Sequence, residues 1–366
     1  MVVALCLAQL CLHMRQPSPQ VDAPSALAFA ETQLRKTIET KYREPDGLHY
    51  RESFGSDKTA FLWSQSVTLS ALARGLAENR HVYQPLWETA RRALDSYWSL
   101  GNPGGYAVLP HQRLNPERFY DDNVWIVWAF LDAYRTTRDE SDLNHALKAY
   151  AFVVSGKDSA LGGGIYWQER KKTEKNACIN APAAAVAFQL FEITKDKKYL
   201  DMGNELLDWT HHTLQDTDGL LFDNISITGK LERTKWTYNS ACYIRALVER
   251  YQILHNPADE IEALRVLSSA QNKWIDPQTH LLKDPGPFGQ HLLDAMFEAS
   301  RAFNRPELAA TATQTILSVL KVCPDSQHLY GEYWNRKPHA TEDRNLKNVA
   351  SVLRSVLSAE ISLKGR

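Results

Sequence analysis

Two consecutive aspartates, Asp121 and Asp122, stand directly before a stretch that is apolar on almost every side, NVWIVWAF. One interpretation is structural, because Asp is favoured at the start of a helix, where its charge complements the macrodipole. The other is chemical, because cleavage of a glycosidic bond needs one carboxylic acid to protonate the leaving oxygen and one carboxylate to attack the sugar or activate water. Mutual repulsion and partial burial would keep one of the pair protonated near neutral pH while its neighbour ionises.

Other patterns in the chain give weaker indications of chemistry. The stretch DTDGLLFDN has Leu220 where a calcium loop needs an oxygen ligand, and no Glu closes the loop. The stretch LGGGIYW lacks the Lys and the glycine spacing of a phosphate-binding loop. The five cysteines are widely spaced without a C-x-x-C pair, which argues against a disulfide framework and against a zinc site. We therefore expect no metal ion and no cofactor.

The composition indicates a neutral partner. Charged residues make up 23% of the 366 residues and the formal net charge is −1, so no overall field favours nucleic acid or an anionic membrane surface. Ten Trp and fifteen Tyr exceed ordinary usage. Their flat apolar faces with a polar edge suit stacking on sugar rings. We expect a carbohydrate-like ligand and no nucleic acid.

Residues 1–22 are interpreted as a separate N-terminal segment. Its apolar run resembles the core of a short signal peptide, but no Lys or Arg precedes the run. The segment is therefore either a degenerate export signal or an over-long start ahead of Met14, and both a cytoplasmic and an exported location stay open. At about 11 residues the run is too short to span a membrane. We expect residues 23–366 to form a single catalytic domain that is a monomer.

Helix-period apolar patterns dominate the rest of the chain, and no run of alternating residues predicts a β-strand. Even-numbered predicted helices are apolar on most faces, whereas odd-numbered ones carry a single apolar stripe, which predicts an inner and an outer set. The twelve predicted helices span residues 25–42, 63–77, 85–99, 121–134, 141–154, 180–193, 198–211, 237–254, 257–270, 288–303, 306–319 and 344–361.

The predicted inner helices begin about every 55 residues, which is typical of a repeated helical hairpin. Six hairpins that close on themselves give an all-α (α/α)6 barrel, and an open solenoid is the alternative. Long loops rich in Gly, Pro and aromatic residues precede the inner helices, and such loops are usually functional. Polar and aromatic residues cluster at these helix starts, and caps alone do not need Trp63, Trp236 and Tyr238 there. The pattern predicts one concave ligand site formed by the N-terminal ends of the inner helices.

Four stretches resemble glycoside hydrolase family 76, the α-1,6-mannanases. They are YDDN with Trp125, GGIYW at 163–167, KNACIN at 175–180, and GLLFDNI followed by WTYN within 219–239. The resemblance covers roughly residues 25–361. It implies an (α/α)6 barrel, a mannan or manno-oligosaccharide substrate, and a retaining mechanism with Asp121 as nucleophile and Asp122 as acid/base. It also implies sugar subsites lined by Trp63, Tyr166, Trp167, Asn176, Asn180, Asp223, Tyr238 and Asn239.

The chain departs from the family pattern in three places. Ser240 and Ala241 follow WTYN where Gln-Gly is common, GPFGQHLLDAMFEA lacks an expected Lys-Gly and Arg, and HLYGEYWNR replaces a Trp- and Gly-rich ending. These differences leave open endo or exo cleavage, the exact linkage, and hydrolysis or transglycosylation.

Two other functions are consistent with the same architecture. A sugar 2-epimerase or isomerase would use His residues at inner-helix starts as proton carriers, and only His291 and, less well, His111 are suitably placed for that. A non-catalytic glycan-binding protein would keep the Trp residues but would not need the carboxylate pair.

Overall fold

The computed structural model describes residues 22–112 and 115–365. The interpretation of residues 1–21 as an export signal or an over-long start, and with it Cys6 and Cys11, lies outside the described residues. Asp22 is the first described residue, and its side chain accepts a hydrogen bond from the Ser25 backbone at the start of α1.

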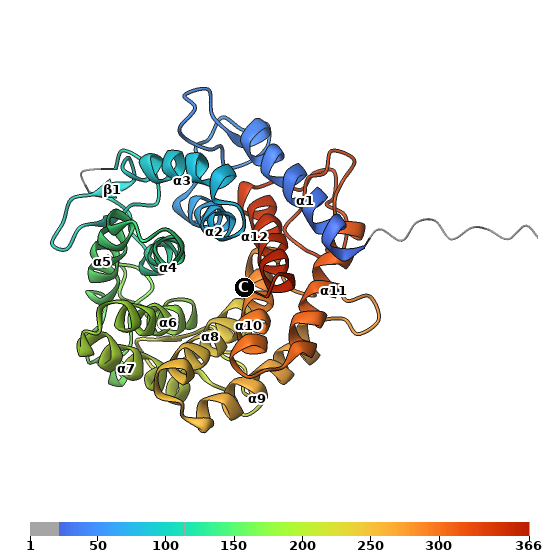
Figure 1. Ribbon diagram of the computed structural model, residues 1–366. Coiled ribbons are helices and arrows are strands. Elements are labelled where there is room, and N and C mark those ends of the chain that lie inside the picture. Colours follow the sequence, from blue (N-terminus) through green and yellow to red (C-terminus); the bar gives the residue numbers. More distant parts are fainter. Residues whose placement is uncertain (1–21, 113–114, 366) are drawn as a thin grey trace, which may run out of the picture.

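Six helices form an inner ring in which each packs against the next (Figure 1). The last packs on the first, since α12 contacts α2, so the ring is closed. The inner helices are α2 (Leu62–Glu78), α4 (Tyr120–Thr137), α6 (Ala177–Thr194), α8 (Thr237–Leu254), α10 (Gly286–Ala302) and α12 (Leu346–Leu363). The predicted all-α (α/α)6 barrel is confirmed, and the open solenoid is excluded.

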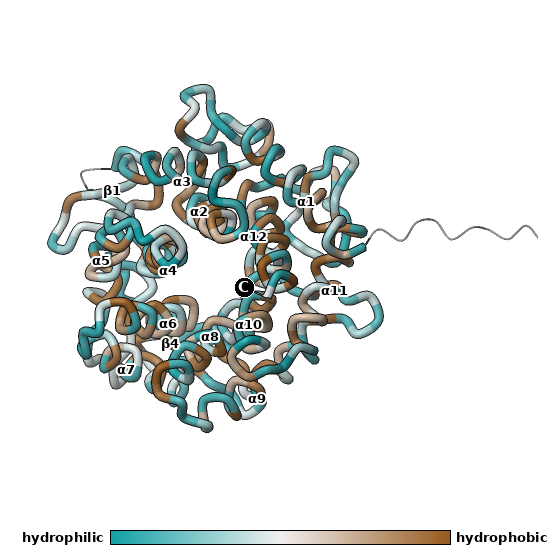
Figure 2. Tube along the Cα trace, viewed as in Figure 1, coloured by the Kyte–Doolittle hydropathy of each residue, from teal (hydrophilic) through white to brown (hydrophobic). Residues whose placement is uncertain are grey.

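The other six helices of the described residues form an outer ring around the first (Figure 1). They are α1 (Ala23–Thr37), α3 (Arg80–Leu94), α5 (Glu140–Val154), α7 (Lys197–Leu214), α9 (Pro257–Trp274) and α11 (Pro306–Val322). Hydrophobic residues gather on the inner helices and between the two rings, whereas the outer perimeter is largely hydrophilic (Figure 2). The core therefore lies between the two rings, as the contrast between all-round and striped helices predicts.

The inner helix α6 shows why all-round apolar helices belong to the inner ring. Residues 177–190 are all buried, because α4 and α8 flank the helix and α7 covers its outer side. It is also the one helix among residues 22–112 and 115–365 that is long and apolar enough to cross a membrane, and 78% of it is buried inside the protein. Its apolar surface is thus already covered by protein.

The bounds of α3 differ from the prediction of a helix at 85–99. That prediction takes Pro85 as a first-turn residue, whereas the helix begins at Arg80 and contains Pro85 in its second turn. Asn79 caps α3, since its Oδ1 accepts a hydrogen bond from the Val82 backbone at 3.4 Å. A proline this close to the start removes one intrahelical hydrogen bond without ending the helix.

Two small antiparallel sheets contradict the expectation that the chain contains no strands. β1 (Trp98–Ser99) pairs with β2 (Gly105–Tyr106), and β4 (Asn224–Ser226) pairs with both β3 (Glu174–Asn176) and β5 (Leu231–Glu232). Each strand has only two or three residues, too few for an alternating pattern to be recognised. The second sheet fastens the loop before α6 to the loop before α8.

The two rings differ in how their helices begin. Inner helices have no side-chain cap, and their first backbone N–H groups are left for the loops and the interior. Five of the six outer helices are capped by a side chain that accepts a backbone hydrogen bond, from Asp22, Asn79, Asp139, Asp196 and Asn256. Groups from the loops satisfy the first N–H of each inner helix instead, such as the Asp223 carbonyl for α6 at 2.8 Å and the Asp284 carboxylate for α8 at 2.7 Å.

Asn123 and Asn180 occupy the fourth positions of α4 and α6, and each fastens the loop ahead of its helix. The Asn180 side chain accepts from the Ile165 N–H at 2.7 Å and donates to the Ile165 carbonyl at 3.0 Å and to the carbonyl four residues earlier at 2.9 Å. The Asn123 side chain makes the equivalent three bonds. It accepts from the Tyr106 N–H at 2.8 Å and donates to the Tyr106 carbonyl at 3.0 Å and to the Phe119 carbonyl at 2.8 Å. These asparagines fix the loops that line the barrel mouth.

We predict that Asn180→Ala lowers the free energy of unfolding by about 2–3 kcal/mol, because it leaves a buried backbone N–H and carbonyl without partners. Urea denaturation followed by circular dichroism measures the change. The matched control is Asn272→Ala, at an exposed position of α9, which should shift stability by no more than about 0.5 kcal/mol. Equal effects of the two substitutions would contradict the role given to Asn180.

Candidate active site

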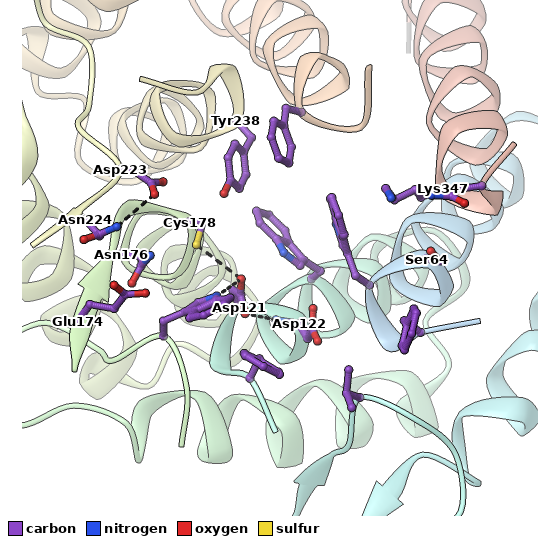
Figure 3. Close-up of a pocket in the computed structure, with 18 of the residues that line it drawn as sticks. Ser64, Asp121, Asp122, Glu174, Asn176, Cys178, Asp223, Asn224, Tyr238 and Lys347 are labelled. Atoms are coloured by element: carbon purple, nitrogen blue, oxygen red, sulfur yellow. Dashed lines mark hydrogen bonds between the residues drawn. The ribbon is translucent and has the colours of Figure 1, made fainter. Parts of the chain in front are cut away.

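A cavity of about 610 Å³ opens at the N-terminal ends of the inner helices (Figure 3). Its volume falls in the range of small-molecule and oligosaccharide sites. The lining residues are Glu52, Phe61, Trp63, Ser64, Val108, Phe119, Asp121, Asp122, Trp125, Trp167, Glu174, Asn176, Cys178, Asp223, Asn224, Tyr238, Phe288, Asn345 and Lys347.

Each inner helix contributes a residue of its first turn to this cavity. In a helix the Cα–Cβ bonds tilt toward the N-terminus, so first-turn side chains project beyond the helix end. In five of the six helices the contributing residue occupies the second position, and in α10 the third. These residues are Trp63, Asp121, Cys178, Tyr238, Phe288 and Lys347.

Three donors surround the Asp121 carboxylate. Its Oδ2 accepts a hydrogen bond from the Trp167 indole Nε1 at 2.8 Å and from the Cys178 Sγ at 3.5 Å, and its Oδ1 accepts from the Asp122 backbone N–H at 2.9 Å. Burial raises the pKa of Asp121 to about 6, and these hydrogen bonds limit the rise because they favour the ionised form. Asp121 is thus held as an oriented anion above that pH.

Asp122 has a different environment one residue further along the helix. No group within the described parts of the chain donates a hydrogen bond to its side chain. Burial, followed by repulsion from Asp121 and Glu117, raises its pKa well above the ordinary value. Asp121 therefore ionises first and Asp122 keeps its proton, which is the asymmetry that a nucleophile and an acid need.

Neither aspartate is the cap of α4, because the cap position belongs to Phe119 and the pair falls at the second and third helical positions. The helix N-terminus favours anions by roughly 0.3–1 kcal/mol. Burial acts in the opposite direction and raises the pKa of both groups.

Aromatic side chains form another part of the cavity lining. Phe288 stacks on Tyr238 with ring centroids 4.2 Å apart and on Trp63 at 5.8 Å. The Trp125 ring lies 6.4 Å from that of Tyr238. Such faces bind the apolar side of a sugar ring.

Polar groups near the second sheet complete the cavity. Asp223 accepts hydrogen bonds from the side-chain amides of Asn224 at 3.2 Å and Asn239 at 3.1 Å, and burial raises its pKa. Asn176 has a buried Oδ1 that accepts no hydrogen bond from the described residues. Glu174 lies beside them (Figure 3), and its pKa is raised by burial and by Asp223.

The cavity brings together seven of the ten residues predicted for the site: Trp63, Asp121, Asp122, Trp167, Asn176, Asp223 and Tyr238. The other three do not line it, which corrects the sequence prediction. Asn180 uses its amide on the Ile165 backbone. Asn239 is buried behind Asp223 and donates to it, and Tyr166 is buried with Lys175 over its ring at 4.6 Å.

Several lining residues were missed by the sequence prediction. Cys178, Phe288 and Lys347 could have been found from their first-turn positions once the helix starts were known. Glu52 comes from the loop after the π-helical turn Ile38–Tyr42 that extends α1, and no local pattern marks it.

The two histidines that an epimerase would use do not line the cavity. His291 is buried below Trp125, with ring centroids 4.8 Å apart, and burial lowers its pKa, so the ring is neutral. His111 lies on an exposed turn. Among the described residues, the titratable groups that line the cavity are five carboxyls together with Cys178, Tyr238 and Lys347, and no histidine is among them.

The family model of glycosyl hydrolase family 76 matches residues 31–364. Because this match spans nearly the whole chain, the protein belongs to that family.

Solved structures share the fold. A GH76 α-mannanase of Bacteroides thetaiotaomicron is 26% identical, with a TM-score of 0.89 over 94% of this chain and 99% of that one. The GH76A α-1,6-mannanase of Salegentibacter sp. is 22% identical, with a TM-score of 0.79 over 94% and 100%. Because the Salegentibacter protein is only 22% identical to this chain, its similarity shows a shared fold and no more.

The chain also matches mannan endo-1,6-alpha-mannosidase DFG5 of Saccharomyces cerevisiae, with 21% identity over 298 residues. The match covers 75% of this chain and 62% of the yeast protein. The chain therefore spans about three-fifths of the length of that relative.

We predict that Asp122→Asn raises the free energy of unfolding at pH 8. The raised pKa means that the folded protein binds this proton more tightly than the unfolded chain, so wild-type stability falls as pH rises above about 4. The Asn side chain does not titrate, so the variant should gain about 1–3 kcal/mol over the wild type at pH 8 and much less at pH 4. Urea unfolding at the two pH values measures this.

The matched control is Asp276→Asn, at an exposed turn where hydrogen bonds from Thr279 and Gln278 lower the pKa of the carboxyl. Its effect should have the opposite sign, a loss at pH 8 that disappears in acid. A gain for Asp122→Asn that is independent of pH would contradict the proton-holding role.

Proposed function

We propose that this protein is a retaining glycoside hydrolase that cleaves α-1,6-mannosidic bonds, with Asp121 as nucleophile and Asp122 as acid/base. The observation that carries the proposal is the pair of adjacent carboxyls in one sugar-sized cavity with opposite environments, one surrounded by donors and the other without any. We also propose that residues 23–366 are one catalytic domain that acts as a monomer.

Known relatives support the substrate class. The Bacteroides protein is an α-mannanase, and the yeast relative is a mannan endo-1,6-alpha-mannosidase. A Salegentibacter α-1,6-mannanase variant with two consecutive aspartates replaced by Asn is inactive and was solved with α-1,6-mannotriose. Asp121 and Asp122 are the consecutive aspartates of this chain's cavity.

In the first step, Asp122 donates its proton to the glycosidic oxygen while an Asp121 oxygen attacks the anomeric carbon. The bond from that carbon to the leaving oxygen breaks, and a glycosyl ester on Asp121 forms. The indole N–H of Trp167 and the thiol of Cys178 hold the attacking carboxylate in a fixed orientation, which reduces the reorganisation needed at the transition state.

In the second step, Asp122 is a carboxylate and removes a proton from an incoming water, whose oxygen attacks the anomeric carbon. The ester bond breaks, Asp121 is released, and Asp122 is protonated again. A sugar hydroxyl in place of water would give transglycosylation by the same chemistry. Two inversions leave the anomeric configuration unchanged.

Asp223 and Asn176 are proposed to bind hydroxyls of the sugar on the non-reducing side of the cleaved bond. The two amide donors on Asp223 fix its carboxyl at the cavity surface, and the Asn176 side chain lines the same cavity. Trp63, Trp167 and Tyr238 supply stacking faces.

We predict different losses for Asp121→Ala and Asp122→Ala. Both should lower kcat on α-1,6-mannan by orders of magnitude, because each group acts on the transition state. Asp122→Ala should keep activity on an activated aryl α-1,6-mannoside, whose leaving group needs no acid, and azide should restore turnover with net retention. Asp121→Ala should form no glycosyl-enzyme, as detected by mass spectrometry of the trapped protein.

The product anomer, followed by NMR, separates the mechanisms: an inverted product would refute the retaining assignment. Full activity in two well-folded variants would refute catalysis at this pair, whereas a pure capping role would lower stability by only about 1 kcal/mol with little change in kcat.

We predict that kcat/KM for mannan falls as the pH drops below about 6, because the nucleophile Asp121 becomes protonated there. A second fall at higher pH should follow the loss of the Asp122 proton. Initial rates at low substrate concentration across pH 4–9 measure the profile, with stability checked at each pH. An acid limb centred near pH 4 would contradict the raised pKa of Asp121.

A further inference from the structure

Lys347 presents an enclosed ammonium group to the active-site cavity. It occupies the second position of α12, its side chain points into the cavity from the side of α2 and α12 (Figure 3), and the residue is only 9% exposed. Neither a hydrogen bond nor an ion pair joins its Nζ to any residue in the described ranges 22–112 and 115–365. An ammonium has three N–H donors and no acceptor, so these donors are available to a ligand.

The surroundings of Lys347 are an aromatic ring and a carboxyl that other groups hold in place. Its Nζ lies 4.7 Å over the Trp63 ring. The carboxyl of Glu52 faces it, but both oxygens of that carboxyl already accept hydrogen bonds, from the Phe61 N–H and the Ser64 hydroxyl, each at 2.9 Å. The protein thus anchors Glu52 to its own loop and leaves the lysine donors directed at the cavity.

The two aspartates divide the cavity into two halves. Asp121 hydrogen-bonds to Cys178 of α6 and points toward the half that contains Asn176 and Asp223. Asp122 lies on the other side of the pair, toward the half formed by α2 and α12 with Lys347 (Figure 3). An acid must stand beside the leaving oxygen, and a nucleophile must stand beneath the sugar whose anomeric carbon it attacks.

We propose that Lys347 is a specificity-determining residue of a leaving-group subsite, where its ammonium donates hydrogen bonds to hydroxyls of the sugar that departs. This inference rests on the proposed function. The bound chain then runs from its non-reducing end beside Asp223 and Asn176 to its reducing end beside Trp63 and Lys347. The ring of Trp63 gives the departing sugar an apolar face, and Lys347 with Glu52 gives it a polar edge.

A neutral sugar suits this subsite better than an anionic group. The cavity contains five carboxyls, those of Glu52, Asp121, Asp122, Glu174 and Asp223, and one cation. An added negative charge would be repelled by the ionised carboxyls of the lining, whereas hydroxyls can accept from Lys347 and donate to the carboxyl of Glu52.

The test compares two substrates that differ only in what leaves. Reduced α-1,6-mannohexaose places a sugar in the leaving-group subsite, whereas α-1,6-mannotriosyl fluoride releases fluoride and leaves that subsite without a sugar. Lys347→Met keeps the unbranched apolar stem of the side chain but removes its donors. It should lower kcat/KM on the hexaose by about 10- to 100-fold, the range for a hydrogen bond to a charged group, and change fluoride release by less than about two-fold.

Two further variants make the result specific. Lys347→Arg restores a cationic donor and should recover most of the activity on the hexaose. Asp223→Asn, on the opposite half, should lower kcat/KM on both substrates, because both carry sugars on that side. Melting temperatures confirm that each variant is folded.

Equal losses of Lys347→Met on hexaose and fluoride would overturn the assignment, and so would an unchanged rate on the hexaose. A wild-type protein that cleaves neither substrate would instead overturn the proposed function itself. The two failures are therefore distinguishable.

Discussion

The active site depends on the closure of six inner helices into a ring. An outer helix precedes every inner helix and returns the chain between successive ones, so all six inner helices start at the same end of the barrel. Their first-turn side chains converge on one cavity, and the positive ends of their helix dipoles lie there. A concave site suited to carboxylates thus follows from the architecture before any particular side chain is considered.

A buried layer of charged residues below the cavity holds this ring in register. Arg245 of α8 donates to Glu298 of α10 through two nitrogens at 2.8 and 2.7 Å, and Arg354 of α12 pairs with Asp294 at 2.7 Å. The Arg245 guanidinium also lies 3.7 Å over the Trp128 ring. Loss of one partner would leave an uncompensated buried charge, which is strongly destabilising. The layer fixes the middles of three inner helices relative to one another, and so fixes where their N-terminal ends lie.

The sequence predicts the barrel well because the relevant signal is long-range and periodic. All-round apolar helices and striped helices differ over whole segments, so the two rings could be assigned before any contact was known. The site was harder to predict, since the direction of a side chain depends on register to within one residue. Asn180 and Asn239 have the polarity of ligand-binding residues, but their helical positions turn them toward backbone and toward Asp223. Glu52 reaches the cavity through a loop whose path no local pattern determines.

The functional difference between Asp121 and Asp122 arises from helix geometry. Successive residues of an α-helix point about 100° apart, so two identical side chains one residue apart face different neighbours. The first turns toward α6 and the loop that carries Trp167, where it finds donors that stabilise its anion. The second turns toward the half of the cavity formed by α2 and α12, where nothing in the described structure donates to it and the neighbouring charge is negative. The first turn of α4 therefore places two identical residues in different environments, in which Asp121 is an anion and Asp122 an acid. The angle between them also directs each side chain to a different half of the cavity.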